Sequence, residues 1–291
     1  MKNTKNDLNG WLVIDKPKGM SSAGVVGRLK FLLHPQKIGH AGTLDPLATG
    51  VLPIALGKAT RLIPFVMDDT KTYEFDIRWG VETDTDDLAG KEIASSDTRP
   101  KKEEILKILP QFTGKITQTP SPYSAIKIGG KRAYDLARLG EQVDMPARKI
   151  TVYNLELIKN TRALASFMAK VSKGTYIRTL AHDIAHALGT VGVVTRLHRV
   201  QDGPFEIKNA IPLDTDLEIL PLECVLENLP KLEVDDEMAK RICQGQRIKN
   251  WEKDFPQNIP VAVWNKQKVI AIMHIEKGVW HPECVLASTV S

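Results

Sequence analysis

Apolar and polar positions along the chain follow two periods, one of strands and one of helices. Residues 71–80 (KTYEFDIRWG) alternate strictly, which predicts a strand with Tyr73, Phe75, Ile77 and Trp79 on one face. Shorter apolar or alternating runs predict further strands over 10–15, 150–158, 165–171, 259–264 and 268–275. The helical period predicts helices from Ser21 or Ser22 to Leu33, over 101–109 up to Pro110, over 177–188 with Gly189 as C-cap, and over 237–243.

The pattern changes character near residue 231. The last sixty or so residues contain one short helical run and two strand-like runs, and they read as a small β-rich appendage. The acidic stretch from Glu82 to Asp87 reads as a loop that ends at Gly90. A length of 291 residues fits about two domains, so we expect a boundary that divides the chain into 1–230 and 231–291.

Composition narrows the class of protein. With 42% hydrophobic and 26% charged residues, the chain is a globular protein rather than a disordered, collagen-like or coiled-coil one. No run approaches the roughly 20 apolar residues of a membrane helix. The polar N-terminus has no secretory signal, and the three widely spaced cysteines do not suggest a disulfide framework. We therefore expect a cytoplasmic protein without a membrane partner.

The net charge of +5 conceals an uneven distribution. Residues 1–65 hold nine basic and three acidic side chains, and residues 101–210 hold eighteen and nine. Two other segments are acidic. Residues 66–100 hold four basic and ten acidic side chains, and residues 211–291 hold nine basic and thirteen acidic ones. Two basic blocks can attract a polyanion such as nucleic acid, but on charge alone we favour a solvated surface of uneven charge.

One run gathers residues that suit an active-site loop. Residues 39–53 (GHAGTLDPLATGVLP) place three glycines and two prolines around a single carboxylate, Asp45. The flanking leucines and valine indicate that the loop is held against the core, where a carboxylate becomes desolvated and reactive. The alternative is an ordinary Asp-Pro turn. His40, inside this loop, is either a functional group or a satisfied turn histidine.

Two other runs carry candidate chemistry. Residues 172–179 (SKGTYIRT) join a strand to a helix, and there Tyr176 and Arg178 can meet an anion or a carboxylate such as Asp45. The alternative is a packed tyrosine and a surface arginine. His182 and His186 have the spacing of a zinc-binding helix, but Asp183 replaces the catalytic glutamate and no third ligand follows. We therefore predict no metal site.

Several motifs resemble those of the tRNA pseudouridine synthase B (TruB) family. The run 39–53 closely resembles the signature of that family. The resemblance continues, in family order, through 16–22 (KPKGMSS), 71–73 (KTY), 118–127 (QTPSPYSAIK), 130–134 (GKRAY), 174–178 (GTYIR) and 195–199 (TRLHR). It covers most of residues 10–205, and the last sixty residues look more diffusely like the small PUA-type RNA-binding domain of the family.

This resemblance implies an α+β fold: a mixed, largely antiparallel sheet with flanking helices, followed by the β-rich PUA-like domain. It implies isomerisation of uridine to pseudouridine at position 55, in the T-loop of tRNA. Residues 1–230 would form the catalytic domain and 231–291 an RNA-binding one. The reaction changes no oxidation state, so neither cofactor nor metal is implied, and no protein partner is required.

The roles of the family transfer onto matching positions. Asp45 would be the catalytic carboxylate, attacking C1′ or the base, and Arg178 would pair with it. Tyr73 would stack on the base and help to move a proton. Tyr176 and Leu197 would line the pocket for the base. His40 would fill the gap that the extruded base leaves in the stack. Lys16 and Pro17 would support the active-site loop.

Three rival interpretations remain at this point. A guide-RNA-dependent relative that modifies ribosomal RNA would share the loop around Asp45. A non-catalytic RNA-binding or tRNA-folding protein would bind tRNA without forming product. A metallohydrolase built on His182 and His186 would contain stoichiometric zinc.

Overall fold

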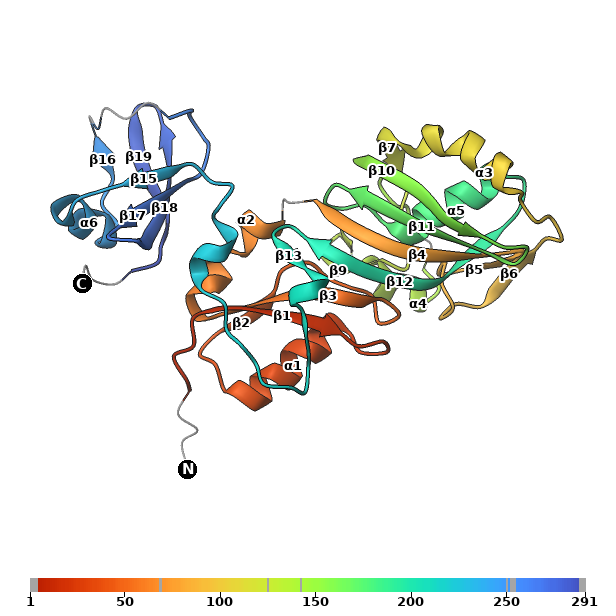
Figure 1. Ribbon diagram of the computed structural model, residues 1–291, viewed down its shortest axis with the longest axis horizontal. Helices are drawn as coiled ribbons and strands as arrows, with labels where there is room; N and C mark the ends of the chain where they lie inside the picture. The colour runs from red at the N-terminus through yellow and green to blue at the C-terminus, as the bar shows by residue number, and fades with distance from the viewer. Residues whose placement is uncertain are drawn as a thin grey trace.

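A ten-stranded mixed sheet forms the larger part of the molecule (Figure 1). The computed structural model describes residues 5–67, 70–124, 126–141, 143–249, 251 and 255–287. Ala125 of the motif 118–127, and residues 1–4 and 288–291 of the two expected domains, lie outside these ranges. The main path of the sheet runs β14-β1-β3-β12-β4-β11-β10-β7, with β2 paired to β3 and β13 to β12.

The strands of this sheet are β1 (Gly10–Lys16), β2 (Ile38–His40), β3 (Thr49–Leu56), β4 (Lys71–Trp79), β7 (Gly114–Gln118), β10 (Arg148–Asn160), β11 (Leu164–Val171), β12 (Gly192–Asp202), β13 (Phe205–Glu206) and β14 (Ile211–Pro212). Two small hairpins pair β5 (Val81–Thr83) with β6 (Glu92–Ser95), and β8 (Lys127–Ile128) with β9 (Lys131–Arg132). Only β1/β14 and β3/β12 are parallel pairs among these strands. The sheet is therefore mixed and largely antiparallel, as the resemblance implied.

The helices are α1 (Ser22–Leu33), α2 (Ile63–Met67), α3 (Lys102–Ile108), α4 (Ala133–Arg138), α5 (Ile177–Ala187) and α6 (Asp236–Cys243). Short 3-10 turns occur at Gly57–Arg61, Leu109–Phe112, Ile207–Asn209 and Leu222–Val225. Ser21 caps α1, because its side chain accepts a hydrogen bond from the Gly24 backbone N–H. No helix in the described part of the chain is long and apolar enough to cross a membrane.

Strict alternation along the strands divides the core between the two faces of the sheet. In β1, Leu12 and Ile14 pack on the face that α1 and α5 cover, whereas Trp11 and Val13 point to the other face. All four apolar side chains predicted on one face of 71–80 lie in the helix-covered core. This packing fixes the end of β4 that carries Tyr73.

A second sheet, of five strands, follows from residue 231. Its order is β15-β17-β18-β19-β16, and its strands are β15 (Lys231–Glu233), β16 (Ile248–Lys249), β17 (Val261–Asn265), β18 (Lys268–Glu276) and β19 (Val279–Val285). It forms a small β-rich domain beside the large sheet (Figure 1). Ile272 and Cys284 of this domain share a core cluster with Trp11 and Val13. We propose the domain boundary at 230/231, because the new sheet begins there.

The structure corrects the sequence interpretation in two places. Of the run 39–53, only 41–48 is a loop, because β2 includes Gly39 and His40 and β3 begins at Thr49; the apolar residues of β3 are buried on both faces and show no alternation. The predicted loop 82–87 begins inside β5, which pairs with β6. The helix predicted over 101–109 is observed as α3, which ends at Ile108, before Pro110, and a 3-10 turn then runs through that proline.

Gly50 occupies the parallel contact between β3 and β12, and it supports a prediction about stability. Its φ of +97° is one that L side chains rarely adopt, and an added Cβ would clash with the Arg199 carbonyl oxygen. We expect Gly50→Ala to lower the free energy of unfolding by about 2 kcal/mol or more. Urea unfolding would measure this loss. Gly27, whose added Cβ meets nothing within 4 Å, provides the matched control. Equal stability of the two variants would contradict the prediction.

Candidate functional site

The loop that carries Asp45 is fixed at several points. It connects β2 to β3, and the Ser22 side chain at the start of α1 holds it from one side. The Ser22 hydroxyl donates to the Leu44 carbonyl oxygen at 3.0 Å and accepts from the Leu44 N–H at 2.8 Å. The Gly19 N–H donates to the Pro46 carbonyl at 2.7 Å. Asp45 therefore lies between two anchored residues, and its backbone has a defined position.

Lys16 is a second anchor, placed under the same loop. Its side chain is fully buried, and its ammonium group donates to the carbonyl oxygens of Pro17 at 2.9 Å, Met20 at 2.6 Å and Pro46 at 3.4 Å. Burial lowers the pKa of Lys16 to about 8, although the nearby Asp45 carboxylate partly counteracts it. Lys16 thus joins the 16–20 turn to the loop that carries Asp45.

The lowered pKa of Lys16 predicts a pH-dependent stability. Between about pH 8 and 10.5 the unfolded chain binds more protons at this side chain than the folded chain, so stability rises with pH across that window. We expect the stability difference between wild type and Lys16→Met to shift in favour of wild type by up to about 3 kcal/mol over this range. Urea unfolding of both proteins at each pH would measure it. A difference that does not change with pH would contradict the prediction.

Asp45 and Arg178 form the central ion pair of the site. Arg178, on the first turn of α5, donates from Nε to the Asp45 Oδ2 at 2.9 Å. Its other nitrogens donate to the Thr85 carbonyl oxygen at 2.6 Å and the Tyr123 carbonyl oxygen at 3.0 Å, and Asp87 Oδ2 lies 3.8 Å from Nε. The Arg178 side chain is 6% exposed, whereas that of Asp45 is 38% exposed. A buried, fully bonded cation thus orients a carboxylate that remains accessible.

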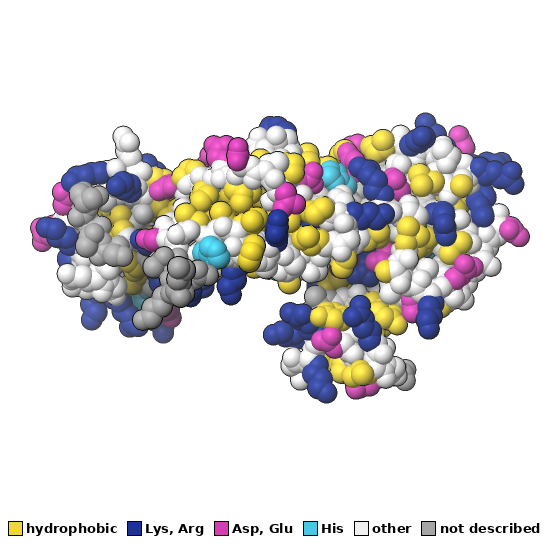
Figure 2. Space-filling model, turned by 90° about the horizontal axis from the view of Figure 1, so that it is seen from below, with side chains coloured by type: hydrophobic (Ala, Val, Ile, Leu, Met, Phe, Trp, Pro, Cys, Tyr) yellow, Lys and Arg dark blue, Asp and Glu magenta, His cyan; other side chains and the backbone are white. Residues whose placement is uncertain are grey.

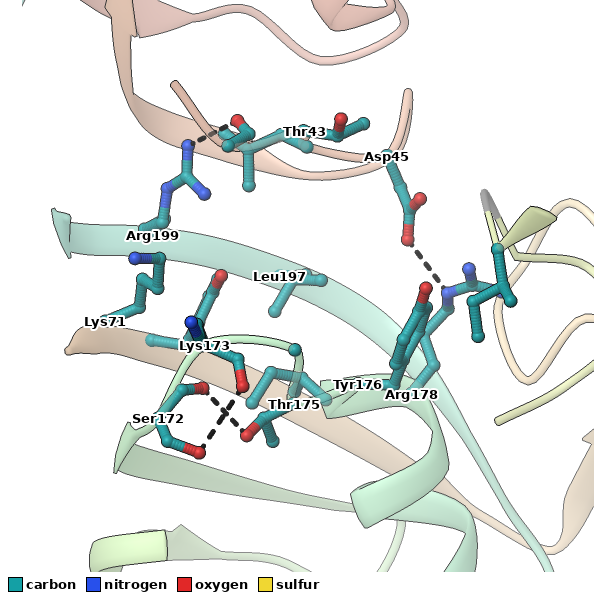
Figure 3. A pocket seen from close by; sticks show the side chains of 16 residues that line it. Thr43, Asp45, Lys71, Ser172, Lys173, Thr175, Tyr176, Arg178, Leu197 and Arg199 are labelled. Atoms are coloured by element: carbon teal, nitrogen blue, oxygen red, sulfur yellow. Dashed lines mark hydrogen bonds and ion pairs between the residues drawn. The ribbon is translucent and has the colours of Figure 1, made fainter. Parts of the chain in front are cut away.

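This pair borders a cavity of about 330 Å³, a size that suits a nucleotide (Figure 3). In Figure 3, Asp45 points across the cavity to Arg178, with Tyr176 beside them and Leu197 on β12. The lining residues come from the loop that carries Asp45, β4, the segment before β8, the segment before α5, α5 itself and β12: Gly42, Thr43, Leu44, Asp45, Lys71, Tyr73, Ile126, Ser172, Lys173, Gly174, Thr175, Tyr176, Ile177, Arg178, Leu197 and Arg199.

Tyr73 lies in the wall of the cavity, above a buried charged cluster. Burial raises the pKa of its hydroxyl, and the Arg199 guanidinium partly opposes this rise. The Arg199 side chain is 1% exposed and contacts the Val51 carbonyl at 2.8 Å, the Gly42 carbonyl at 3.1 Å and the Asp202 Oδ2 at 3.2 Å. Lys71 completes the cluster at 3.0 Å from Asp202 Oδ1.

Sequence reasoning did not assign Lys71, Arg199 or Asp202 to the site. The motifs 71–73 and 195–199 contain two of them, but no pattern in the sequence shows that β4 and β12 are neighbours. The register places Arg199 beside Tyr73 and Asp202 beside Lys71. The signal available in the sequence was a basic residue in each of the two motifs, Lys71 in 71–73 and Arg199 in 195–199.

Tyr176 and Leu197 both line the cavity. Gln118 fixes the backbone of Tyr176 by accepting from its N–H at 3.1 Å and donating to its carbonyl oxygen at 3.3 Å. The Arg148 guanidinium lies 5.5 Å from the centre of the Tyr176 ring, within the range of a cation–π contact. The tyrosine is therefore held before a ligand arrives.

His40 lies at the end of β2 and is not one of the residues that line the cavity. Burial lowers its pKa, with a smaller contribution from Arg199. Its Nδ1 atom is buried and has no hydrogen-bond partner among the described residues. The structure thus brings Asp45, Tyr73, Tyr176, Arg178 and Leu197 to one cavity, with Lys16 beneath the loop and His40 outside the lining.

The arrangement suits nucleophilic or general base chemistry on a flat ring. A carboxylate kept beside a fixed guanidinium stays oriented for attack. Tyrosine and leucine side chains offer surfaces on which a planar base can stack, and Lys71, Lys173 and Arg199 supply positive charge within the same cavity.

Comparisons with known proteins identify the family. Residues 30–177 match the model of the TruB family pseudouridylate synthase (N terminal domain). A tRNA pseudouridine synthase B of Sinorhizobium medicae (strain WSM419) is 43% identical over 298 residues, which cover 96% of each chain. A protein of the same name from Bradyrhizobium diazoefficiens (strain JCM 10833 / BCRC 13528 / IAM 13628 / NBRC 14792 / USDA 110) is 46% identical over 309 residues, covering 99% of this chain and 89% of its own.

Solved structures share the fold. A chain in a Cbf5-Nop10-Gar1 complex superposes with a TM-score of 0.74 at 24% identity, covering 96% of this chain and 85% of that one. A chain in an H/ACA RNP bound to a substrate RNA containing 2'-deoxyuridine has a TM-score of 0.73, with the same identity and coverage. The expected α+β fold with its β-rich C-terminal domain is therefore confirmed. Since the family match covers half of the chain and the relatives cover nearly all of it, the chain belongs to the TruB family of pseudouridylate synthases and is an enzyme of that class.

Proposed function

We propose that this protein isomerises one uridine in the T-loop of tRNA, at position 55, to pseudouridine. The observation that carries the proposal is the accessible Asp45 carboxylate, held at 2.9 Å by the buried Arg178 in a cavity of nucleotide size. The names of the relatives, tRNA pseudouridine synthase B, support tRNA as the substrate.

The proposed reaction conserves atoms and oxidation state. The bond between N1 of the base and C1′ of the sugar breaks, the bound base rotates, and C5 bonds to C1′. C5 loses its proton and N1 ends protonated. Asp45 attacks either C1′ or the base, and its pairing with Arg178 orients the carboxylate for that attack. Because nothing is oxidised or reduced, the chemistry itself calls for no cofactor.

The target uridine must leave the T-loop stack to reach Asp45. Tyr73 would stack on the flipped base, and its raised pKa keeps the hydroxyl protonated and able to donate near neutral pH. Tyr176 and Leu197 would enclose the base from the other sides of the cavity. His40, just outside the cavity lining, would fill the gap that the base leaves in the stack.

The remaining surface would hold the RNA backbone. Figure 2 shows Lys and Arg side chains spread over one face of the molecule and interspersed with Asp and Glu, not gathered into a single patch. This face would therefore offer scattered contacts to phosphates rather than one continuous basic patch. The domain from residue 231 would add RNA contacts as a PUA-like module. The proposed enzyme acts in the cytoplasm and needs no protein partner.

Release of tritium from substrates labelled at C5 of uridine tests this proposal, because C5 loses its hydrogen in the reaction. A T-stem-loop hairpin with one labelled uridine at position 55 should release its label in the presence of the protein alone. An anticodon-stem-loop hairpin labelled in its loop serves as the control and should release none. Release only after a guide RNA is added would point to the guide-dependent interpretation. Tight binding without release would point to an RNA-folding protein.

A further inference from the structure

Four side chains that commonly bind metals meet between α5 and the turn after β5. His182 and His186 lie one turn apart on α5, with ring centres 4.2 Å apart. Glu82 of β5 lies opposite, with its Oε2 3.1 Å from His186 Nε2 and its Oε1 3.6 Å from His182 Nδ1. Asp86 places its Oδ1 3.2 Å from His182 Nδ1.

The charges of this group do not balance when both imidazoles are neutral. Glu82 and Asp86 are 9% and 8% exposed, and in the described part of the chain their ion pairs are all with these two histidines. Asp183 adds a further carboxylate that interacts with both imidazoles and with Asp86. Buried carboxylates without a cation are costly, so the cluster favours a positive ion.

The orientation of His182 points to the same conclusion. Its Nδ1 atom is buried and close to two carboxylates, yet it forms no well-aligned hydrogen bond with any described residue. This nitrogen can therefore ligate an ion that the nearby carboxylate oxygens also hold. Because His186 is 49% exposed, an ion can enter from the solvent.

The distances also fit a tetrahedral ion. Bonds of about 2.1 Å from zinc to nitrogen and oxygen give edges of about 3.4 Å between ligand atoms. Glu82 lies near this distance from both histidines, at 3.1 Å from His186 Nε2 through Oε2 and at 3.6 Å from His182 Nδ1 through Oε1, and ligand atoms of the three residues lie within 4.8 Å of one another. We propose that Glu82, His182 and His186 bind one divalent transition-metal ion, with Zn²⁺ as the best match, and that Asp86 stays beside His182 at 3.2 Å. Three protein ligands leave the fourth position of a tetrahedral ion to water.

The ion would join two elements that hold Arg178, the partner of Asp45. Thr85, three residues after the ligand Glu82, accepts a hydrogen bond from Arg178, and Arg178 lies one turn before His182 on α5. The sequence predicted no metal site because no third ligand follows the helix. Glu82 instead precedes His186 by 104 residues and comes from another element.

Zinc titration of the full-length protein, stripped of metal with a chelator and dialysed, tests the site. Calorimetry should show one Zn²⁺ per chain, and both His186→Gln and Glu82→Gln should weaken its affinity by about 100-fold or more. His281→Gln is the matched control, since His281 also stacks on a second histidine, His274, which lies 3.7 Å from the carboxylate of Glu283. This control variant should bind Zn²⁺ as wild type does.

Two further readouts do not depend on catalysis. Zn²⁺ should raise the melting temperature of wild type and of His281→Gln, but not that of His186→Gln. Co²⁺ in place of Zn²⁺ should give the visible absorption bands of a four-coordinate ion. Less than half an equivalent of bound Zn²⁺ in wild type, undiminished binding by His186→Gln when that variant remains folded, or the spectrum of a six-coordinate Co²⁺ would each overturn the proposal.

Discussion

Asp45→Asn is expected to reduce the single-turnover rate of pseudouridine formation by about 10⁴-fold or more. The amide has the size of the carboxylate and can stay near Arg178. It carries no negative charge, so it cannot attack the sugar or the base and cannot act as a general base. Since the Asp45 side chain is 38% exposed and its loop is anchored through Ser22 and Lys16, the fold should be retained. Quenched-flow assays on labelled tRNA would measure the rate.

Two controls separate a loss of chemistry from a loss of binding or folding. The tRNA affinity and melting temperature of Asp45→Asn should match those of wild type. Asp97→Asn changes an exposed carboxylate in the described part of the chain and should leave the rate unchanged. Near wild-type turnover by Asp45→Asn would remove Asp45 from its proposed role.

Arg178→Ala should affect both activity and stability. It would leave the carbonyl oxygens of Thr85 and Tyr123 without their donor and the buried Asp87 without its nearby cation. Breaking a buried ion pair in this way costs about 3–5 kcal/mol. The single-turnover rate should fall by about 10³-fold, because Asp45 loses the group that orients it. Urea unfolding and single-turnover assays would measure the two effects.

A conservative variant distinguishes orientation from charge. Arg178→Lys keeps the positive charge but cannot donate to Asp45, Thr85 and Tyr123 at once, so its rate should remain well below that of wild type even where its stability recovers. Arg196→Ala breaks an exposed pair with Glu74 and should change stability by less than about 1 kcal/mol. A wild-type rate in Arg178→Lys would show that the fixed fork of hydrogen bonds is unnecessary.

The parts of the fold that sequence predicts well are those with a visible period. The alternation over 71–80 predicted β4 and the face that carries Tyr73. A cap at Ser21 or Ser22 predicted the start of α1, and the structure has Ser21 as the cap. The sequence pattern did not predict β3, because its residues are buried on both faces and therefore show no alternation of apolar and polar positions. Gly50 and Pro53, which are typical of loops, also argued against a strand. The predicted loop over 39–53 therefore runs into this central strand.

The residues of the candidate site also divide into those that the sequence predicts and those that only the tertiary structure brings together. Residues within a dense motif, such as Asp45 and Arg178, could be predicted because their neighbours in the sequence are also informative. The cluster of Lys71, Arg199 and Asp202 could not, since it depends on the register of β4 against β12. Glu82 likewise meets His182 and His186 only through tertiary packing.

The most direct test of the central claim is pseudouridine mapping on an unmodified, full-length tRNA transcript incubated with the purified protein and no additions. We predict one pseudouridine, at the T-loop uridine of position 55, and none when Asp45→Asn replaces the wild-type protein. A transcript without pseudouridine, or with pseudouridine only outside the T-loop, would contradict the account.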